Sequence, residues 1–157
     1  MKADYLNPFT ESAVSVISQL LDDQGISRGL LQVRDDPVVS SGVATMIGIN
    51  GRLLGHVVYD MDRGTAIQIA TVMNGEDMPG INSLVRSTIN ELANMISGNA
   101  MIMLESKGFH CNITPPTFMM GERSEIYAAK GSRHLIVPFD TKCGRVTLSL
   151  SLSEAPL

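Results

Sequence analysis

PGINSLVRSTINELANMISGNAMIMLESKGFHCNITPPT, residues 79–117, is the stretch that decides the fold, because most of it predicts one long helix. A cap at Asn82 or Ser83 and a helix-ending glycine at Gly108 place this helix at about 81–107. At about 100° of turn per residue, its apolar side chains fall within about 80° of one another. They are Val85, Ile89, Leu92, Ile96, Ala100 and Met103. This face predicts burial against a core.

The opposite face of the predicted helix carries Ser87, Glu91, Asn94 and Gly98 within an arc of about 60°. A solvated surface would explain Glu91 and Asn94 taken alone. Asn and Gly, however, each cost a helix interior from a few tenths to about 1 kcal/mol relative to Ala. The pair Asn94 and Gly98 therefore indicates that a partner approaches this helix closely, although close packing within the protein would also explain Gly98.

The spacing of the polar residues matches a known signature, [D/S]-x3-E-x2-N-x21-P, read here as Ser87, Glu91, Asn94 and Pro116. On these residues and on the flanking segments ELANMISG and GFHCNITPPT, the chain resembles the CheC, CheX and FliY family of chemotaxis phosphatases. The flanking segments are most similar to the CheX branch. The resemblance covers nearly the whole chain, and it implies hydrolysis of the aspartyl phosphate of a CheY-type response regulator.

The resemblance also implies a role for each motif residue. Asn94 would orient the attacking water, and Glu91 would contact a Lys of the regulator. The regulator brings its own Mg²⁺, so no cofactor and no metal ligand is expected in this chain. Ser87, Gly98 and Pro116 complete the expected substrate-binding set: Ser87 orients the helix, Gly98 admits the partner's backbone, and Pro116 shapes the neighbouring loop.

Two interpretations from different classes fit this helix. The first is an enzyme, a protein aspartyl-phosphate phosphatase. The second is a non-catalytic dimeric adaptor that binds the regulator through the same face. CheX-like proteins are dimers, and an exposed edge strand at the Leu-rich segment 145–153 would favour a homodimer in either case.

The composition restricts the class of protein. With 157 residues, 44% hydrophobic and 18% charged, the chain predicts one ordered domain, 1–157. The net charge of −4 argues against a nucleic-acid partner. Neither a signal peptide nor an apolar run long enough for a membrane span is visible, so a cytoplasmic location is expected.

Other kinds of site lack support in the sequence. Cys111 and Cys143 have neither CxxC spacing nor a nearby His pair, so they predict reduced thiols and not a zinc site. His56, His110 and His134 fall in separate segments and are interpreted as surface or edge-strand residues. No nucleophile signature or phosphate-binding loop is present, which makes a self-contained hydrolase a poor interpretation.

The rest of the chain predicts an α+β fold with a mainly antiparallel sheet and helices packed on one face. Helices are expected from about residue 7 to the acidic turn before Gly25 and from Asp62 to Asn74. An Asn50–Gly51 turn predicts a hairpin. Strands are expected at 30–34, 43–49, 53–59, 111–113, 119–129, 133–140 and 145–153.

A repeat predicts two related halves, as in CheC-like proteins. Three pairs of identical residues are each 80 positions apart: Glu11 and Glu91, Gly51 and Gly131, and Asp60 and Asp140. Family members of the CheC type carry a Glu and Asn pair on both equivalent helices. Here Val14 stands 80 positions before Asn94, so only the second half is expected to carry the chemistry.

Overall fold

The long helix is present as α3, Ser83–Ser106, in the computed structural model, which describes residues 3–156. The side chain of its N-cap, Asn82, accepts a hydrogen bond of 2.8 Å from the backbone N–H of Val85. Gly108 adopts a positive φ of 92° just beyond the helix, a conformation that glycine reaches without a steric penalty. The predicted start and end are therefore confirmed by local capping chemistry.

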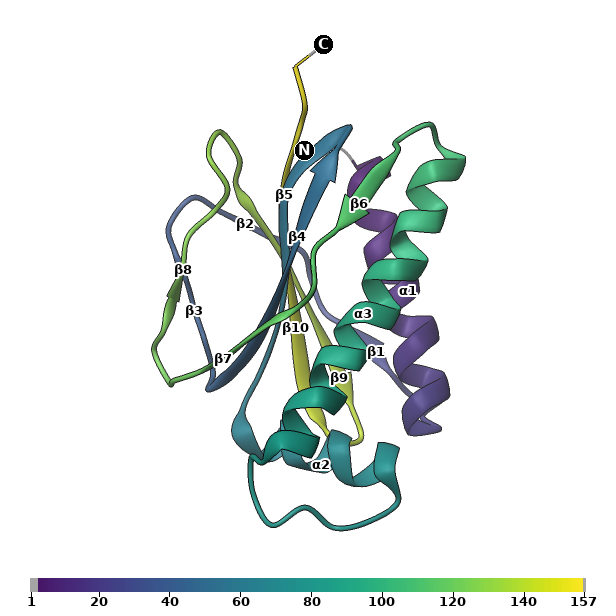
Figure 1. The fold of residues 1–157 in the computed structure, drawn as a ribbon, viewed down its shortest axis with the longest axis vertical. Helices are drawn as coiled ribbons and strands as arrows, with labels where there is room; N and C mark the ends of the chain where they lie inside the picture. The colour runs from purple at the N-terminus through teal and green to yellow at the C-terminus, as the bar shows by residue number, and fades with distance from the viewer. Residues whose placement is uncertain (1–2, 157) are drawn as a thin grey trace.

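A sheet of antiparallel strands supports α3, and together they confirm the predicted α+β class (Figure 1). The hydrogen-bonded order is β1-β9-β10-β5-β4-β6, and in addition β2 pairs with β9 and β7 with β4. Strands β3 and β8 form a small second sheet. The strands are β1 Ser27–Arg28, β2 Gln32–Arg34, β3 Val38–Val39, β4 Val43–Gly51, β5 Leu53–Met61, β6 Cys111–Ile113, β7 Thr117–Met120, β8 Glu125–Ile126, β9 His134–Thr141 and β10 Gly144–Glu154.

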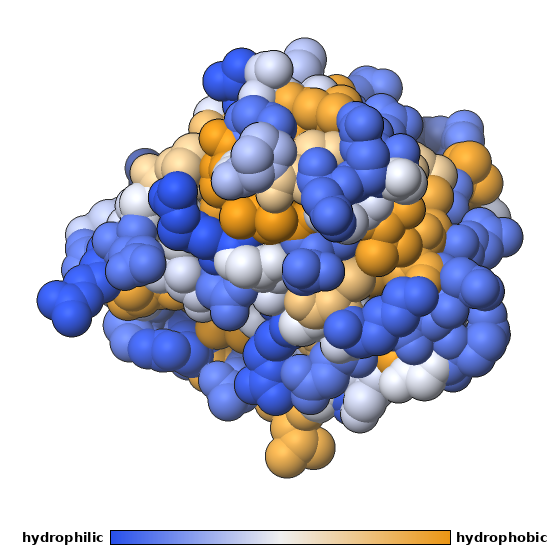
Figure 2. Space-filling view, turned by 90° about the horizontal axis from the view of Figure 1, so that it is seen from below, coloured by the Kyte–Doolittle hydropathy of each residue, from blue (hydrophilic) through white to orange (hydrophobic). Residues whose placement is uncertain are grey.

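Two helices, α1 (Ala3–Leu21) and α3, pack against each other on one face of the sheet (Figure 1). The short helix α2, Arg63–Asn74, contacts α3 near one end of the sheet and is capped as predicted, since Asp62 accepts from the Thr65 N–H at 2.7 Å. Over that end of the molecule, polar side chains alternate with smaller apolar areas (Figure 2). The continuous apolar layer lies inside, between the helices and the sheet.

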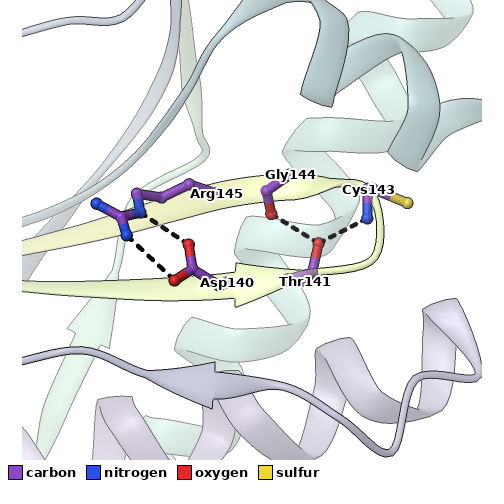
Figure 3. Close-up of polar contacts among 5 residues, drawn as sticks. All are labelled: Asp140, Thr141, Cys143, Gly144 and Arg145. Atoms are coloured by element: carbon purple, nitrogen blue, oxygen red, sulfur yellow. Dashed lines mark hydrogen bonds and ion pairs between the residues drawn. The ribbon is translucent and has the colours of Figure 1, made fainter.

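Local hydrogen bonds hold the turn of the hairpin between β9 and β10 (Figure 3). The Thr141 hydroxyl donates to the Gly144 carbonyl at 2.8 Å and accepts from the Cys143 N–H at 3.0 Å. Beside it, the Arg145 guanidinium donates to both oxygens of Asp140 at 2.8 and 3.1 Å. This paired Arg145 lowers the pKa of Asp140.

The last strand differs from the prediction. The Leu-rich strand β10 lies between β9 and β5 and is not an edge, so the edge-strand argument for a dimer is wrong. Its second face is also covered, because Ser149 and Ser151 are buried. The segment 127–133 crosses that face, and the N–H of Ala129 donates to the Ser151 hydroxyl at 2.8 Å. The position of β10 in the sheet depends on pairing between distant segments, which the local alternation of residues does not indicate.

The long strand expected at 119–129 is also wrong in extent. The chain breaks into β7 and β8, with positive φ angles of 150° at Gly121 and 65° at Arg123 between them. A turn therefore replaces the middle of the predicted strand.

The repeat is confirmed only in outline. In both halves a helix precedes a hairpin: α1 precedes β4 and β5, and α3 precedes β9 and β10. The hairpins do not keep the predicted offset: the 80-residue spacing places Asp60 in the second strand of one hairpin and Asp140 in the first strand of the other. These two aspartates are therefore not equivalent positions, and Asp60 is buried whereas Asp140 is exposed.

Two of the three histidines are not simple surface residues. His134 is fully buried, with Nδ1 3.1 Å from the Ser149 hydroxyl, and the ring of His56 lies 6.5 Å away between centroids. Burial lowers the pKa of both side chains; the nearby His134 adds to the effect on His56, and the Ile126 carbonyl partly offsets it at His134. The surface interpretation is wrong for His134 and holds for His110, which is exposed.

These lowered pKa values predict a stability that decreases in mild acid. An unfolded chain protonates its histidines as the pH falls through about 6.5, whereas the folded chain resists protonation of this pair. The free energy of unfolding, measured by urea titration, is expected to be highest above that pH and to fall progressively below it. In a His134→Gln variant, the free energy of unfolding should depend less steeply on pH, whereas a His110→Gln variant should keep the pH dependence of the parent. An unchanged slope in His134→Gln would contradict the assignment.

Candidate functional site

The motif residues lie on the side of α3 that faces away from the sheet. Glu91 is exposed and Asn94 is half-buried. They are three residues apart, which places them side by side with an axial separation of about 4.5 Å. Ser87, one turn earlier, and Gly98, one turn later, are on the same side. The structure therefore brings these four residues together.

Hydrogen bonds from the inward side fix the rotation of α3. The Thr45 hydroxyl on β4 donates to the Asn90 carboxamide oxygen at 2.7 Å. Deeper in the core, the hydroxyls of Tyr59 and Ser97 lie 2.8 Å apart and are both buried. Because buried hydroxyls without a partner are costly, a rotation of the helix would be strongly disfavoured.

A third bond anchors the first half of the helix: the Asn74 amide at the end of α2 donates to the Thr88 hydroxyl at 2.9 Å. These positioning residues were missed by sequence reasoning. A periodicity assigns Thr88 and Ser97 to the apolar side of α3, but it does not identify their partners on other elements.

Glu91 and Asn94 differ from these anchored side chains. Within residues 3–156, neither Glu91 nor Asn94 makes a side-chain hydrogen bond or ion pair. By contrast, the Ser87 hydroxyl donates to the Ser83 carbonyl of its own helix at 3.0 Å. The carboxylate and the carboxamide are thus free to bind a partner, whereas the Ser87 hydroxyl is occupied by the backbone.

Gly98 is not required by packing inside this protein. A Cβ built on Gly98 meets no atom within 4 Å, apart from the immediate helix backbone. Close packing within the protein, one of the two explanations for this glycine, is therefore excluded. The surface beside Asn94 is a bare helix backbone.

Pro116, the last residue of the signature, lies outside α3. It is half-buried in the connection between β6 and β7, and α3 contacts both of these strands. The Thr114 hydroxyl in the same connection accepts from the Gly48 N–H at 2.8 Å, which fixes the loop to β4. The structure thus places Pro116 in a loop that is tied to the sheet, and its role at the motif stays a prediction.

The described residues form neither a metal site nor a disulfide. Across residues 3–156, no group of three or more His, Cys, Asp or Glu is arranged to hold a metal ion. Cys111 and Cys143 are both free thiols, and burial raises the pKa of Cys143. Within residues 3–156, no helix is long and apolar enough to cross a membrane.

Comparisons with known proteins place this geometry in a family context. The family description "Chemotaxis phosphatase CheX" matches residues 43–140. The curated CheY-P phosphatase CheX of Thermotoga maritima is 34% identical over 89 residues, which are 56% of this chain and 57% of that protein. The matched segment thus spans little more than half of that relative.

Solved structures match over almost the full length. The CheX of the CheX-CheY-BeF3-Mg²⁺ complex from Borrelia burgdorferi has a TM-score of 0.83 and 33% identity, with 98% of this chain and all 100% of that chain covered. A chemotaxis protein CheX from Desulfovibrio desulfuricans has a TM-score of 0.85 and 25% identity, with 95% and 99% covered.

Proposed function

The chain belongs to the CheX family of chemotaxis phosphatases, and on that premise we propose that it hydrolyses the aspartyl phosphate of a CheY-type response regulator. One observation carries the proposal. Glu91 and Asn94 lie side by side on the outward face of α3, and within residues 3–156 their side chains have no partner. Such groups are available to complete an active site on another protein.

In the proposed mechanism, α3 enters the phosphorylation site of the regulator. The Asn94 carboxamide carries both a donor and an acceptor, so it holds a water molecule in line with the phosphorus atom. The water oxygen forms a new bond to phosphorus as the bond to the regulator's Asp oxygen breaks, which releases inorganic phosphate and restores the carboxylate. Positioning is the main contribution of this chain, because the acyl phosphate is already reactive.

The remaining motif residues hold the two proteins in register. Glu91 pairs with a Lys of the regulator, and the bare backbone at Gly98 allows the regulator to approach closely. Ser87 supports the helix through its backbone bond, and Pro116 shapes the loop at the border of the face. The Mg²⁺ is part of the phosphorylated substrate, in keeping with the Mg²⁺ found in the Borrelia burgdorferi complex.

We further propose that residues 1–157 act as one phosphatase domain that works as a homodimer in the cytoplasm. The larger apolar cluster joins all three helices to the central strands, which supports the domain assignment. The dimer is proposed from the family alone, since β10 offers no free edge. Sedimentation of a monomer at micromolar concentration would contradict it.

Turnover is the experiment that tests the function. A substoichiometric amount of this protein, added to an excess of phosphorylated CheY-type regulator, is expected to speed phosphate release through many cycles. A non-catalytic adaptor affects at most the fraction of regulator that it binds. Acceleration limited to that fraction, or none, would overturn the proposed activity.

Gly98 offers a separate prediction, in which stability and activity change in opposite directions. Replacing it with Ala adds a better helix former in open space, so Gly98→Ala should raise the free energy of unfolding by about 0.5–1 kcal/mol. The added methyl group should also obstruct the regulator and raise KM. Urea denaturation and steady-state kinetics measure the two effects. A variant that is more stable and has an unchanged KM would show that no close approach occurs at this glycine.

A further inference from the structure

An exposed apolar side chain lies on the same helix as the motif. Ile102 is 68% exposed, the largest exposed fraction among the large apolar residues of α3. It is two turns beyond Asn94, about 12 Å along the helix axis, and its direction lies within about 80° of that of Asn94. Gly98, which has no side chain, separates the two. Along this face, the helix therefore presents the polar motif residues first, then the backbone at Gly98, and then the apolar side chain of Ile102.

Shallow hollows flank Ile102 on both sides. One, of about 260 Å³, lies towards β6 and is lined by Met101 and Glu105 among others. The other, of about 380 Å³, lies towards α1 and is lined by Glu11 and Met103 among others. Ile102 borders both hollows, so it forms a ridge between two depressions that a partner's side chains can enter.

The charge around this ridge has one sign. Glu11 and Glu105 lie in the two hollows, and no Lys or Arg is among the described residues that line either one. His110 also lines the hollow towards β6, and its Nδ1 is 3.3 Å from a carboxylate oxygen of Glu105. Glu91 adds a further negative charge to the same face of the helix. A complementary surface is therefore apolar at its centre and basic at its rim.

We propose that Ile102 and the two hollows beside it form the docking anchor for the response regulator, which meets them with an apolar spot rimmed by Lys or Arg. The inference rests on the proposed function. A standard interface buries about 800 Å² per partner and is roughly 30 Å across. A regulator centred on Asn94 therefore also covers Ile102, only about 12 Å away. Continuity with the motif face favours this occupant over a second copy of the chain.

An Ile102→Ala variant tests the anchor, with Leu30→Ala as the matched control. Leu30 is 87% exposed and lies between β1 and β2, far from α3 in the chain. Ile102→Ala is expected to raise KM about tenfold, and to weaken the binding of beryllofluoride-activated regulator by a similar factor, as truncation of a central apolar anchor does. At saturating regulator, kcat should stay within about twofold, because the reacting groups are intact. Leu30→Ala should change neither value.

The outcomes separate the anchor from the phosphatase activity. If the parent protein does not accelerate phosphate release, the proposed function fails; weaker binding of activated regulator by Ile102→Ala would still support the anchor. If the parent is active but Ile102→Ala matches Leu30→Ala in KM and in affinity, the anchor is overturned. A change in sedimentation of this chain alone, without loss of regulator affinity, would also overturn it and would mark a contact between copies.

Discussion

An Asn94→Ala variant is expected to lose about a hundredfold or more in kcat while it keeps the fold and the affinity for phosphorylated regulator. The expectation follows from geometry. The Asn94 carboxamide makes no hydrogen bond within residues 3–156, so its removal leaves no internal partner unpaired. If it orients water in the transition state, its loss affects the chemical step and not the docking of the two proteins. Stopped-flow dephosphorylation gives kcat and KM, and circular dichroism reports the fold.

Gln68→Ala provides the matched control for this loss. Gln68 is an exposed carboxamide on α2, and it lies outside the motif face. Its removal should leave both kinetic constants within about twofold of the parent. Equal activity in Asn94→Ala and Gln68→Ala would exclude the carboxamide at position 94 from the mechanism.

A Gly55→Ala variant is expected to lose about 3–5 kcal/mol of the free energy of unfolding, which is exceptional for one added methyl group. Gly55 has a φ of 148°, and a Cβ built there would lie only 1.9 Å from the carbonyl oxygen of Ser151. Gly55 lies on β5 and Ser151 on β10, and these two strands are paired, so the added methyl group would meet the backbone of a neighbouring strand. Neither strand can move aside without breaking the register on which the centre of the sheet depends. Urea denaturation measures the loss.

Gly131→Ala separates the clash from the strain of a positive φ. Gly131 has a φ of 78°, and a Cβ there meets no atom within 4 Å. This substitution should cost only about 1–2 kcal/mol, the usual penalty of a left-handed residue. Equal losses at the two glycines would show that the sheet yields at Gly55 and that the predicted clash does not occur.

Local chemistry explains what the sequence predicted well. The caps at Asn82 and Asp62 act on neighbouring N–H groups, and the apolar stripe of α3 repeats within one helix. These patterns depend on residues within a few positions of one another. For the same reason, the spacing of Glu91 and Asn94 is sufficient to predict that they share one face of the helix.

Long-range pairing explains what the sequence did not predict. Whether β10 lies at an edge depends on β9 and β5, and the surroundings of the buried His134 include Ser149 on the neighbouring strand β10. Likewise, the bond between Thr45 and Asn90 joins residues far apart in the chain. The periodicity of side chains along one element does not identify their partners on other elements.

The most direct test of the account compares the parent protein with Asn94→Asp, in which a carboxylate of nearly the same shape replaces the carboxamide. Phosphate release is followed with each protein substoichiometric to a phosphorylated CheY-type regulator. The account predicts many turnovers with the parent and, with Asn94→Asp, a rate close to that of the regulator alone, because the amide donor is lost and a negative charge faces the phosphoryl group. Equal turnover by the two proteins would contradict the claim that the Asn94 amide directs the attacking water.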